Sequence, residues 1–352
     1  MTKKRLLMKW LRYGLLAVLV VSITVYAYWP SPYIIYRPGS AEEVRPMIHM
    51  EDAYLDEAGS FMLTTVNVLS NTNMATYWYV KWFNKHAQIF LEREIYREGE
   101  THEEYRERQG YNMMNSQSMA ALAAYQSADI EFELRTEQVI VLGVQKGFPA
   151  EKALAAGDIL LEVNGEKAAD TQTVAELIQR QKVGDAVTIT YKRNNEVHDV
   201  PITLVELDGD MSNSRPGIGV TMGNVMEVVP VDPGKKVTIE AGSIGGPSAG
   251  LMFAMEIYNQ LVPEDVTKGY RIAGTGEING NGEVGRIGGV RHKVIAADRE
   301  KADLFFCPVE NGDEARAAAA ELGTTMEVVP VSTMDEVLAY LDRLPPKHEQ
   351  DR

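Results

Sequence analysis

The sequence contains a single cysteine, Cys307. One thiol excludes an intrachain disulfide framework and any metal site built from several cysteines. Cys307 lies in the apolar run 303–309, which predicts a buried strand in which the thiol serves as a small apolar side chain. Histidine is also scarce, with 6 residues and no His-Glu-x-x-His arrangement, so the helical zinc site of many metalloproteases is excluded. We therefore expect no metal.

Phosphate-binding and nucleic-acid-binding features are missing as well. No Gly-x-x-x-x-Gly-Lys-Ser/Thr sequence occurs anywhere in the chain, so it has no P-loop, and the glycines of 216–220 resemble one only superficially. Lysine and arginine number 35 against 50 aspartates and glutamates, giving a net charge of −15. A nucleic-acid binder would present a basic face. We expect no cofactor and no nucleic-acid partner.

The composition otherwise fits an ordinary globular protein. Hydrophobic residues make up 45% and charged residues 24% of the 352 positions, close to the average for soluble domains. This length predicts two or three domains.

The N-terminus has the pattern of a membrane anchor. Residues 1–12 form a basic flank, and the uncharged run that follows lasts from Tyr13 to Tyr36. The 20 residues from Trp10 to Trp29 would make a helix of about 30 Å, the thickness of a bilayer core. We expect a transmembrane helix over 13–29, ended by prolines. The basic residues on the short side predict a cytoplasmic N-terminus and an extracytoplasmic remainder; they are Lys3, Lys4, Arg5, Lys9 and Arg12.

A cleaved signal peptide is the alternative for this segment. No small-x-small cleavage site follows the apolar run, which favours a retained anchor. The expected localisation is the cell membrane, with a single pass.

Residues 127–206 resemble a bacterial PDZ domain. Phe148-Pro149-Ala150 and the run from Ala155 to Gly165 carry the resemblance, which implies a β-sandwich or barrel-like fold that docks peptides on a sheet edge. The preceding residues, 37–126, predict a mixed α/β region that packs with the PDZ domain.

Ser248 follows two glycines and a proline in Gly245–Gly250. Apolar residues then recur at helical spacing, at Leu251, Ala254, Met255 and Tyr258. Pro247 suits a first helical turn, so Ser248 should lie at a helix N-terminus, where free backbone N–H groups can stabilise an anion. The alternative is a plain serine cap after a Gly-Pro turn.

A second glycine turn precedes Lys293, in the run from Ile287 to Ala297. Between the two turns, Ile272–Ile278 predicts a short strand entering a glycine-rich hairpin. Taken alone, Lys293 would be read as a solvated surface charge.

The three motifs together resemble the proteolytic domain of the Lon family, over about 237–310. That resemblance implies that Ser248 is the nucleophile, Lys293 the general base, Thr275 the threonine that hydrogen-bonds the lysine and Glu277 the glutamate of the same motif. Gly246 and Pro247 would support the serine. Lon proteases often have Asp-Gly before Pro-Ser. The Gly-Gly found here matches stand-alone, membrane-tethered Lon-like proteases with a PDZ domain, of the pheromone-processing type.

The chemistry sets a condition on Lys293. A serine hydroxyl needs a base, and a neutral amine near pH 7 requires the lysine pKa to fall by roughly 3 units from about 10.4. Burial in an apolar site produces such shifts. Val290, Val294 and Ile295 are the predicted walls.

The rest of the expected proteolytic domain, 207–345, alternates strands and helices after Lys293, as α/β domains do. A polar tail follows at 346–352. The predicted fold class is thus multidomain: a transmembrane helix, a mixed α/β region, a PDZ domain and an α/β Lon-type proteolytic domain.

The function hypothesis is an ATP-independent, membrane-anchored serine endopeptidase with a Ser-Lys dyad. Its partners would be extracytoplasmic peptide or protein substrates presented through the PDZ domain, and the resemblance implies regulatory processing and a possible homo-oligomer. Two alternatives stay open: a non-catalytic PDZ adaptor on a Lon-like scaffold, and a general quality-control protease.

Overall fold

The computed structural model describes residues 2–56, 58–97, 99–207 and 215–347, with side chains from residue 8 onwards. Lys3, Lys4 and Arg5 of the basic flank therefore lie outside the described side chains, and 348–352 of the expected tail lie outside the described residues. The chain divides into two units, one of residues 1–39 and 66–99 and the other of residues 40–65 and 100–352. Strands β1 (Tyr33–Glu43) and β3 (Ser60–Leu69) contribute residues to both.

The first unit begins with helix α1, Thr2–Ala27. Within the described part of the chain, its segment Met8–Ala27 (20 residues) is the one helix long and apolar enough to cross a membrane. Strand β4 pairs antiparallel with the start of β1, Tyr33 opposite Leu91. The remaining elements of this unit are α2 (Met74–Phe83), β4 (Gln88–Leu91) and α3 (Glu92–Ile95).

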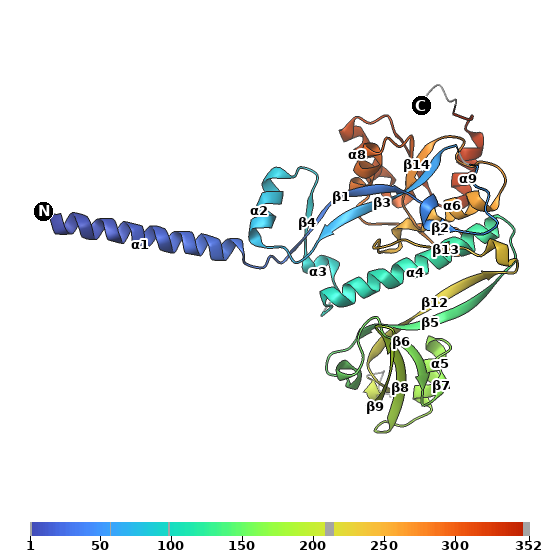
Figure 1. Cartoon of the computed structure of the whole chain (residues 1–352), viewed down its shortest axis with the longest axis horizontal. Helices are drawn as coiled ribbons and strands as arrows, with labels where there is room; N and C mark the ends of the chain where they lie inside the picture. Colours follow the sequence, from blue (N-terminus) through green and yellow to red (C-terminus); the bar gives the residue numbers. More distant parts are fainter. Residues whose placement is uncertain (1, 57, 98, 208–214, 348–352) are drawn as a thin grey trace. The chain divides into compact units, whose positions relative to one another are not determined.

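The second unit is built on a sheet with the strand order β18-β17-β14-β3-β1, of which Figure 1 labels β14, β3 and β1. Its strands β18, β17, β14 and β3 run parallel. Every residue of β17 is buried, Cys307 included, which confirms the predicted buried strand. The strands are β14 (Arg271–Gly274), β17 (Leu304–Pro308) and β18 (Glu327–Val331), and the helices around them are α6 (Gly250–Leu261), α7 (Val290–Arg299), α8 (Gly312–Leu322) and α9 (Met334–Arg343).

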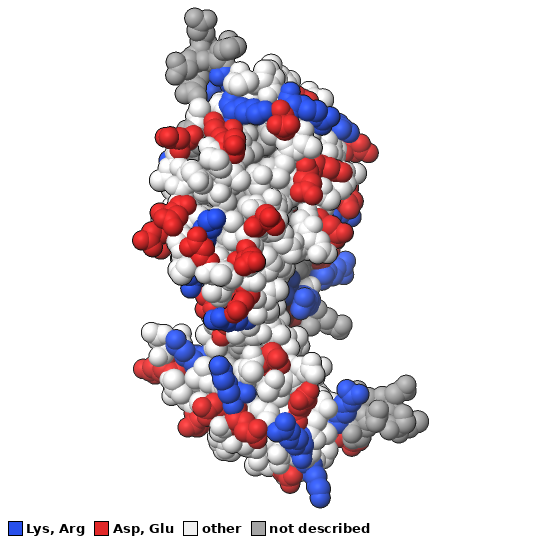
Figure 2. All heavy atoms as spheres, turned by 90° about the vertical axis from the view of Figure 1, so that its right-hand side faces the viewer, with Lys and Arg blue, Asp and Glu red and all other residues white. Residues whose placement is uncertain are grey.

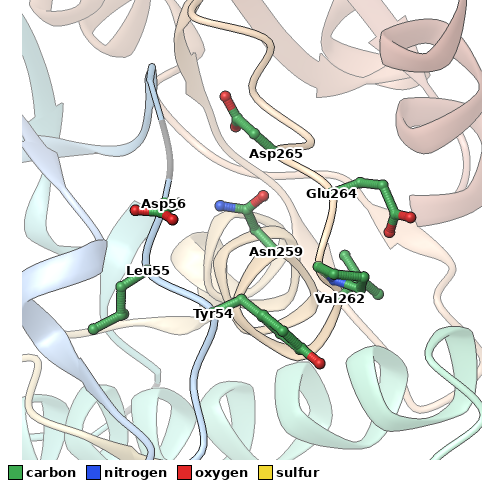
Figure 3. A pocket seen from close by; sticks show the side chains of 8 residues that line it. Tyr54, Leu55, Asp56, Asn259, Val262, Glu264 and Asp265 are labelled. Carbon is green, nitrogen blue, oxygen red and sulfur yellow. The ribbon is translucent and has the colours of Figure 1, made fainter.

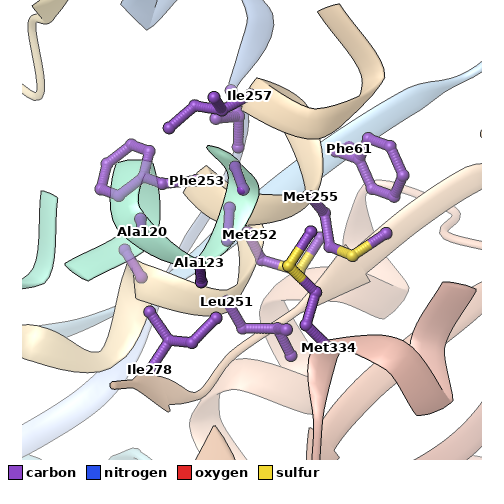
Figure 4. Packing of buried hydrophobic residues seen from close by; sticks show 14 of the residues in the cluster. Phe61, Ala120, Ala123, Leu251, Met252, Phe253, Met255, Ile257, Ile278 and Met334 are labelled. Carbon is purple, nitrogen blue, oxygen red and sulfur yellow. The ribbon is translucent and has the colours of Figure 1, made fainter. Parts of the chain in front are cut away.

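Part of the segment 37–126, expected as a mixed α/β region, belongs to this α/β layer, and its last helix also contacts strands of the second sheet described below. β3 lies next to β14, with Phe61 opposite Ile272. Helix α4 (His102–Ser127) packs along α6, where Ala120 and Ala123 meet the apolar side chains of α6 (Figure 4). Alanines allow the two helices to approach closely, and the sequence could not indicate which partner they face.

A second sheet follows the order β12-β5-β6-β8-β9, with β7 beside β6. Helix α5 (Thr171–Gln179) begins at the N-cap Asp170, whose carboxylate accepts from Thr173 N, and it buries Val174, Leu177 and Ile178. The strands are β5 (Phe132–Val144), β6 (Ile159–Val163), β7 (Glu166–Lys167), β8 (Ala186–Arg193), β9 (Glu196–Thr203) and β12 (Val220–Pro230).

Strand β12 belongs to this second sheet although it lies wholly beyond residue 206, the expected end of the PDZ domain. It pairs with β5 along its whole length, from Val220 opposite Val144 to Pro230 opposite Phe132. Its pairing partner, β5, lies about 90 positions earlier in the chain. The local sequence therefore does not indicate this pairing.

Short elements complete the second unit. They are η1 (Arg45–Met47), β2 (Ile48–His49), η2 (Pro149–Lys152), β10 (Val205–Leu207), β11 (Arg215–Gly217), η3 (Pro233–Lys235), β13 (Thr238–Ile239), η4 (Pro247–Ala249), β15 (Glu277–Ile278), β16 (Val284–Gly285) and η5 (Val309–Asn311). On the face drawn in Figure 2, carboxylates are spread among the basic side chains.

Candidate active site

Ser248 lies in a tight loop at the start of α6. Gly246 has φ +87°, a conformation that L side chains rarely adopt, and Pro247 opens the single 3-10 turn that leads into the helix. A Cβ on Gly250 would come within 2.9 Å of the Ile278 side chain and 2.7 Å of Ser116 Oγ. The glycines therefore allow the backbone to pack closely there, and the expected position of Ser248 at a helix N-terminus is confirmed.

Lys293 approaches this serine from the first turn of α7. The helix begins after Gly289, which is left-handed at φ +70°. The Lys293 side chain is 3% exposed, and its Nζ donates to Ser248 Oγ over 2.9 Å and to the carbonyl oxygen of Thr64 over 2.7 Å. The structure thus joins two residues that are 45 positions apart in the sequence.

Within the described ranges, no ion pair involves the Lys293 amine. Both described partners of Lys293 Nζ are uncharged oxygens, and Val290, Val294 and Ile295 around its helix are buried. Desolvation disfavours the ammonium form and lowers the pKa of Lys293 to about 7. The expected depression is confirmed, and a large fraction of the amine is neutral near pH 7.

Thr64 is a site residue that the sequence did not reveal. Strand β3 places its carbonyl against Lys293 Nζ, and its own hydroxyl donates to Gly274 O over 2.9 Å. A main-chain carbonyl needs no particular side chain, so residue types give no signal for this role.

Thr275 has a different partner from the one expected. Its hydroxyl donates to the carbonyl oxygen of Ser248 over 2.9 Å, and the Gly276 N–H donates to the same oxygen over 2.9 Å. Over the described ranges no bond joins Thr275 to Lys293. The backbone bond from Thr275 N to Phe306 O fixes the strand end, and at this position the hydroxyl holds the serine loop rather than the amine.

The expected oxyanion donors are also reduced in number. The Gly246 N–H donates to Gln109 O over 3.0 Å, and Pro247 has no N–H. Of the three residues 246–248, this leaves the backbone N–H of Ser248 as the donor for an oxyanion, because it has no partner among the described residues. The sequence predicts free backbone N–H groups around Ser248, and the contact with Gln109 of α4 removes that of Gly246.

Helix α4 holds the serine loop from a side that the sequence did not indicate. Besides the Gln109 contact, the Ser116 hydroxyl donates to Pro247 O over 2.9 Å. One turn earlier, the Tyr111 hydroxyl donates to Asn224 O in β12 over 3.2 Å. The same helix therefore bonds both the serine loop and the edge strand of the second sheet.

Glu277 lies on the surface in β15, directly after Gly276. Partial desolvation raises the pKa of its carboxyl, and it lines a hollow with Glu283, Glu310 and Ser332. In the part of the chain that the structure covers, no hydrogen bond connects Glu277 with Ser248 or Lys293, so its expected supporting role stays a prediction.

Another hollow lies at the far end of α6 (Figure 3). Asn259, on the last turn of that helix, accepts from Val266 N over 2.9 Å, and Tyr54 and Asp265 also line the space. Because α6 rises about 1.5 Å per residue, this hollow is some three turns away from Ser248 and cannot contribute to its chemistry.

Residues 235–342 match the model of the Lon protease (S16) C-terminal proteolytic domain, and residues 129–204 match the PDZ domain model. The chain contains a Lon-type proteolytic domain and a PDZ domain. Ser248, Thr275, Glu277 and Lys293 all lie in the first of these. The PDZ match falls inside the expected 127–206.

Relatives of the Lon-type domain include the Lon protease of Rhizobium meliloti, 36% identical over 107 residues (30% of this chain, 13% of the relative). The Lon protease of Roseiflexus castenholzii is 36% identical over 115 residues (32% and 14%), and that of Endomicrobium trichonymphae 35% over 101 residues (28% and 12%). The chain spans about an eighth of the length of these curated relatives.

Solved structures similar to the chain include PDZ domains of SdrC-like proteins. That from Listeria innocua is 35% identical and covers 24% of this chain and 93% of its own, with a TM-score of 0.23. That from Listeria monocytogenes is 34% identical and covers 24% and 85%, with a TM-score of 0.22.

Proposed function

We propose that this protein is an ATP-independent, membrane-anchored serine endopeptidase with a Ser248–Lys293 dyad. The proposal rests on the buried Lys293 amine. Its Nζ lies 2.9 Å from Ser248 Oγ, and burial lowers the pKa of Lys293 to about 7. Acyl transfer to serine needs a nucleophile hydrogen-bonded to a base whose pKa lies near the operating pH. The match to the Lon proteolytic domain supports the same reaction.

In the first half-reaction, Ser248 Oγ attacks the scissile carbonyl carbon while its proton passes to neutral Lys293 Nζ. In this state the Ser248 hydroxyl donates to the Lys293 amine across the 2.9 Å contact, whereas a charged Lys293 donates to Ser248 Oγ. The Ser248 N–H faces the developing oxyanion. Lys293 gives the proton to the leaving amine, and the peptide C–N bond breaks. Water, deprotonated by the same amine, hydrolyses the acyl-enzyme.

The neighbouring groups hold this geometry. The Thr64 carbonyl accepts one amine N–H and so directs the lone pair of the neutral lysine towards the serine. Thr275 and Gly276 fix the serine carbonyl, while Gly246 and Pro247 shape the loop. These residues orient the reacting atoms without exchanging protons.

The substrates we propose are extracytoplasmic peptides or loosely folded proteins that the PDZ domain presents, and the role is regulatory processing of a secreted peptide or a membrane protein. The PDZ match supports peptide docking. The apolar helix Met8–Ala27 supports the anchor, with a cytoplasmic N-terminus inferred from the basic flank. A homo-oligomer is an expectation from the resemblance to Lon.

The test compares cleavage of a labelled, unstructured protein by the full chain in lipid nanodiscs with cleavage by Ser248→Ala and Lys293→Ala. Both variants should lose activity by several orders of magnitude, because members of such a unit fail together. Ser243→Ala in the same loop and Arg299→Ala on the exposed side of α7 are matched controls and should retain it. Cleavage should also persist without ATP and with a chelator. Equal cleavage by the wild type and both folded dyad variants would instead support the PDZ adaptor.

The orientation is tested separately. Protease added to intact spheroplasts that express the chain should digest the region after residue 37. Full protection behind an intact membrane would overturn the proposed sidedness without affecting the dyad.

A further inference from the structure

Helix α2 of the first unit exposes aromatic side chains along one face. Its sequence, MATYWYVKWF, contains no acidic residue. Tyr79, Trp82 and Phe83 are 65%, 69% and 72% exposed, and Ala75 is exposed on the same i, i+4, i+7, i+8 stripe. Only Val80, on another face, is buried. An ordinary surface helix has the opposite polarity.

The rings form an ordered group rather than scattered side chains. Tyr79 and Phe83 lie with ring centroids 5.5 Å apart, and Trp78 and Trp82 5.4 Å apart. Lys81 Nζ lies 5.2 Å from the Trp78 ring centroid. An ammonium over aromatic ring faces is attracted by them, and it marks the polar side of this aromatic group.

This helix is bonded to the end of the membrane-spanning candidate α1, in the same unit (Figure 1). The Met74 N–H donates to Trp29 O over 3.0 Å, and Trp78 Nε1 donates to the Tyr26 hydroxyl over 3.3 Å. Pro30 and Asn73 form an isolated β-bridge. Tyr26, Tyr28 and Trp29 are themselves more than half exposed, so the aromatic groups of α1 and α2 are continuous.

We propose that the exposed face of α2, formed by Tyr79, Trp82 and Phe83, lies in the interfacial layer of the bilayer at the outer end of α1. This inference rests on the proposed membrane anchor. Tyrosine and tryptophan favour the headgroup level, where one end of the ring is apolar and the other wet. The absence of carboxylates and the presence of Lys81 and exposed Lys85 fit an anionic headgroup layer.

The occupant of this face is thus lipid rather than a second copy or a soluble partner. A protein partner would need no continuity with the apolar end of α1, whereas a bilayer that surrounds Met8–Ala27 reaches α2 through the bonds at Trp29 and Tyr26.

The chain contains four tryptophans, Trp10, Trp29, Trp78 and Trp82, which makes the proposal directly measurable. In full-length protein reconstituted into vesicles of phosphatidylcholine and phosphatidylglycerol, one variant keeps only Trp82 and another only Trp10, the others being changed to phenylalanine. A third variant without native tryptophans carries Tyr54→Trp, at an exposed position of the second unit. Emission is measured with phospholipids brominated near the headgroup end or near the terminal methyl of the acyl chain.

Trp82 should show blue-shifted emission and lose more fluorescence to the shallow bromines than to the deep ones, while the tryptophan at position 54 should lose none. Trp10 serves as the anchor control. If Trp10 is quenched and Trp82 is not, α2 does not contact lipid and this inference fails alone; blue-shifted but unquenched Trp82 would mean that protein covers the face. If neither is quenched, the membrane anchor of the proposed function fails with it.

Discussion

Lys293 and the exposed face of α2 both reverse the usual distribution of polar and apolar groups, in opposite directions. Around Lys293 a potentially charged amine is 3% exposed, while on α2 large rings such as Trp82 are 69% exposed. The first arrangement disfavours a charge and so makes the lysine reactive. The second leaves apolar surface in contact with solvent unless something covers it. Each reversal costs folding free energy, and each is therefore informative about function.

The two regions also differ in how they are held. Bonds from three distant segments, at Thr64, at Ser116 and at Thr275–Gly276, hold the serine and the lysine. The contacts that hold α2 lie away from its exposed face: bonds to Trp29 and Tyr26, and Tyr77 stacked on Tyr33. A catalytic pair needs fixed geometry, whereas an interfacial helix needs only an apolar face at the level of the lipid headgroups.

The largest expected effect comes from removing the buried amine while keeping its volume. Lys293→Met should reduce turnover by about three orders of magnitude or more and at the same time stabilise the fold. A depressed lysine pKa means that the unfolded chain binds the proton more tightly, so the native state at pH 7 carries a penalty of up to about 4 kcal/mol. Turnover and chemical denaturation check both parts, with Arg299→Met as the exposed control on α7. A less stable Lys293→Met would contradict the desolvation argument.

The pH dependence should follow the same amine. With a pKa of about 7 for Lys293, kcat/KM should fall about tenfold per pH unit below that value and reach a plateau above it. Wild-type stability should rise between about pH 7 and 10, because there the unfolded lysine holds a proton that the native one has lost. Rate profiles and denaturation at several pH values measure both. An acidic limb centred near pH 4 would assign the base to a carboxylate instead.

Loosening the serine loop should have a smaller effect. Thr275→Val and Ser116→Ala each remove one donor to the loop, to Ser248 O and Pro247 O respectively. One hydrogen bond contributes about 1 kcal/mol, and a loss of about 1.4 kcal/mol of transition-state stabilisation lowers kcat about tenfold. We therefore expect a decrease in kcat of up to about tenfold, with KM little changed. Thr238→Val, exposed on β13, is the matched control. A drop as large as that of Lys293→Met would give Thr275 a role in proton transfer.

The smallest effect is expected on the exposed rings. In detergent, Trp82→Ser should change the free energy of unfolding by less than about 0.5 kcal/mol and leave peptide cleavage unchanged. Truncating a fully buried ring, as in Phe306→Ala, should cost about 3–5 kcal/mol. Thermal unfolding of both variants measures the difference. Equal costs would show that the α2 rings pack within the protein and would remove the contrast.

The sequence by itself determined the features that depend on local order of residue types. The apolar run before Pro30 specified a helix, and the Gly-Gly-Pro-Ser run specified a turn opening a helix. Glycine at 246 and 289 is needed because both have positive φ. These features follow from backbone sterics and from side-chain periodicity, which act within a few residues.

Tertiary structure alone decided which residues distant in the sequence contact one another. It placed Thr64 O on the amine, turned Thr275 towards Ser248 O, used the Gly246 N–H on Gln109 and joined β12 to β5. Each of these four contacts uses at least one main-chain atom, which is the same in every residue, and each joins segments that lie far apart in the chain. Such contacts leave no signature in residue type or spacing, because the packing of sheet and helices, rather than the local sequence, brings their partners together.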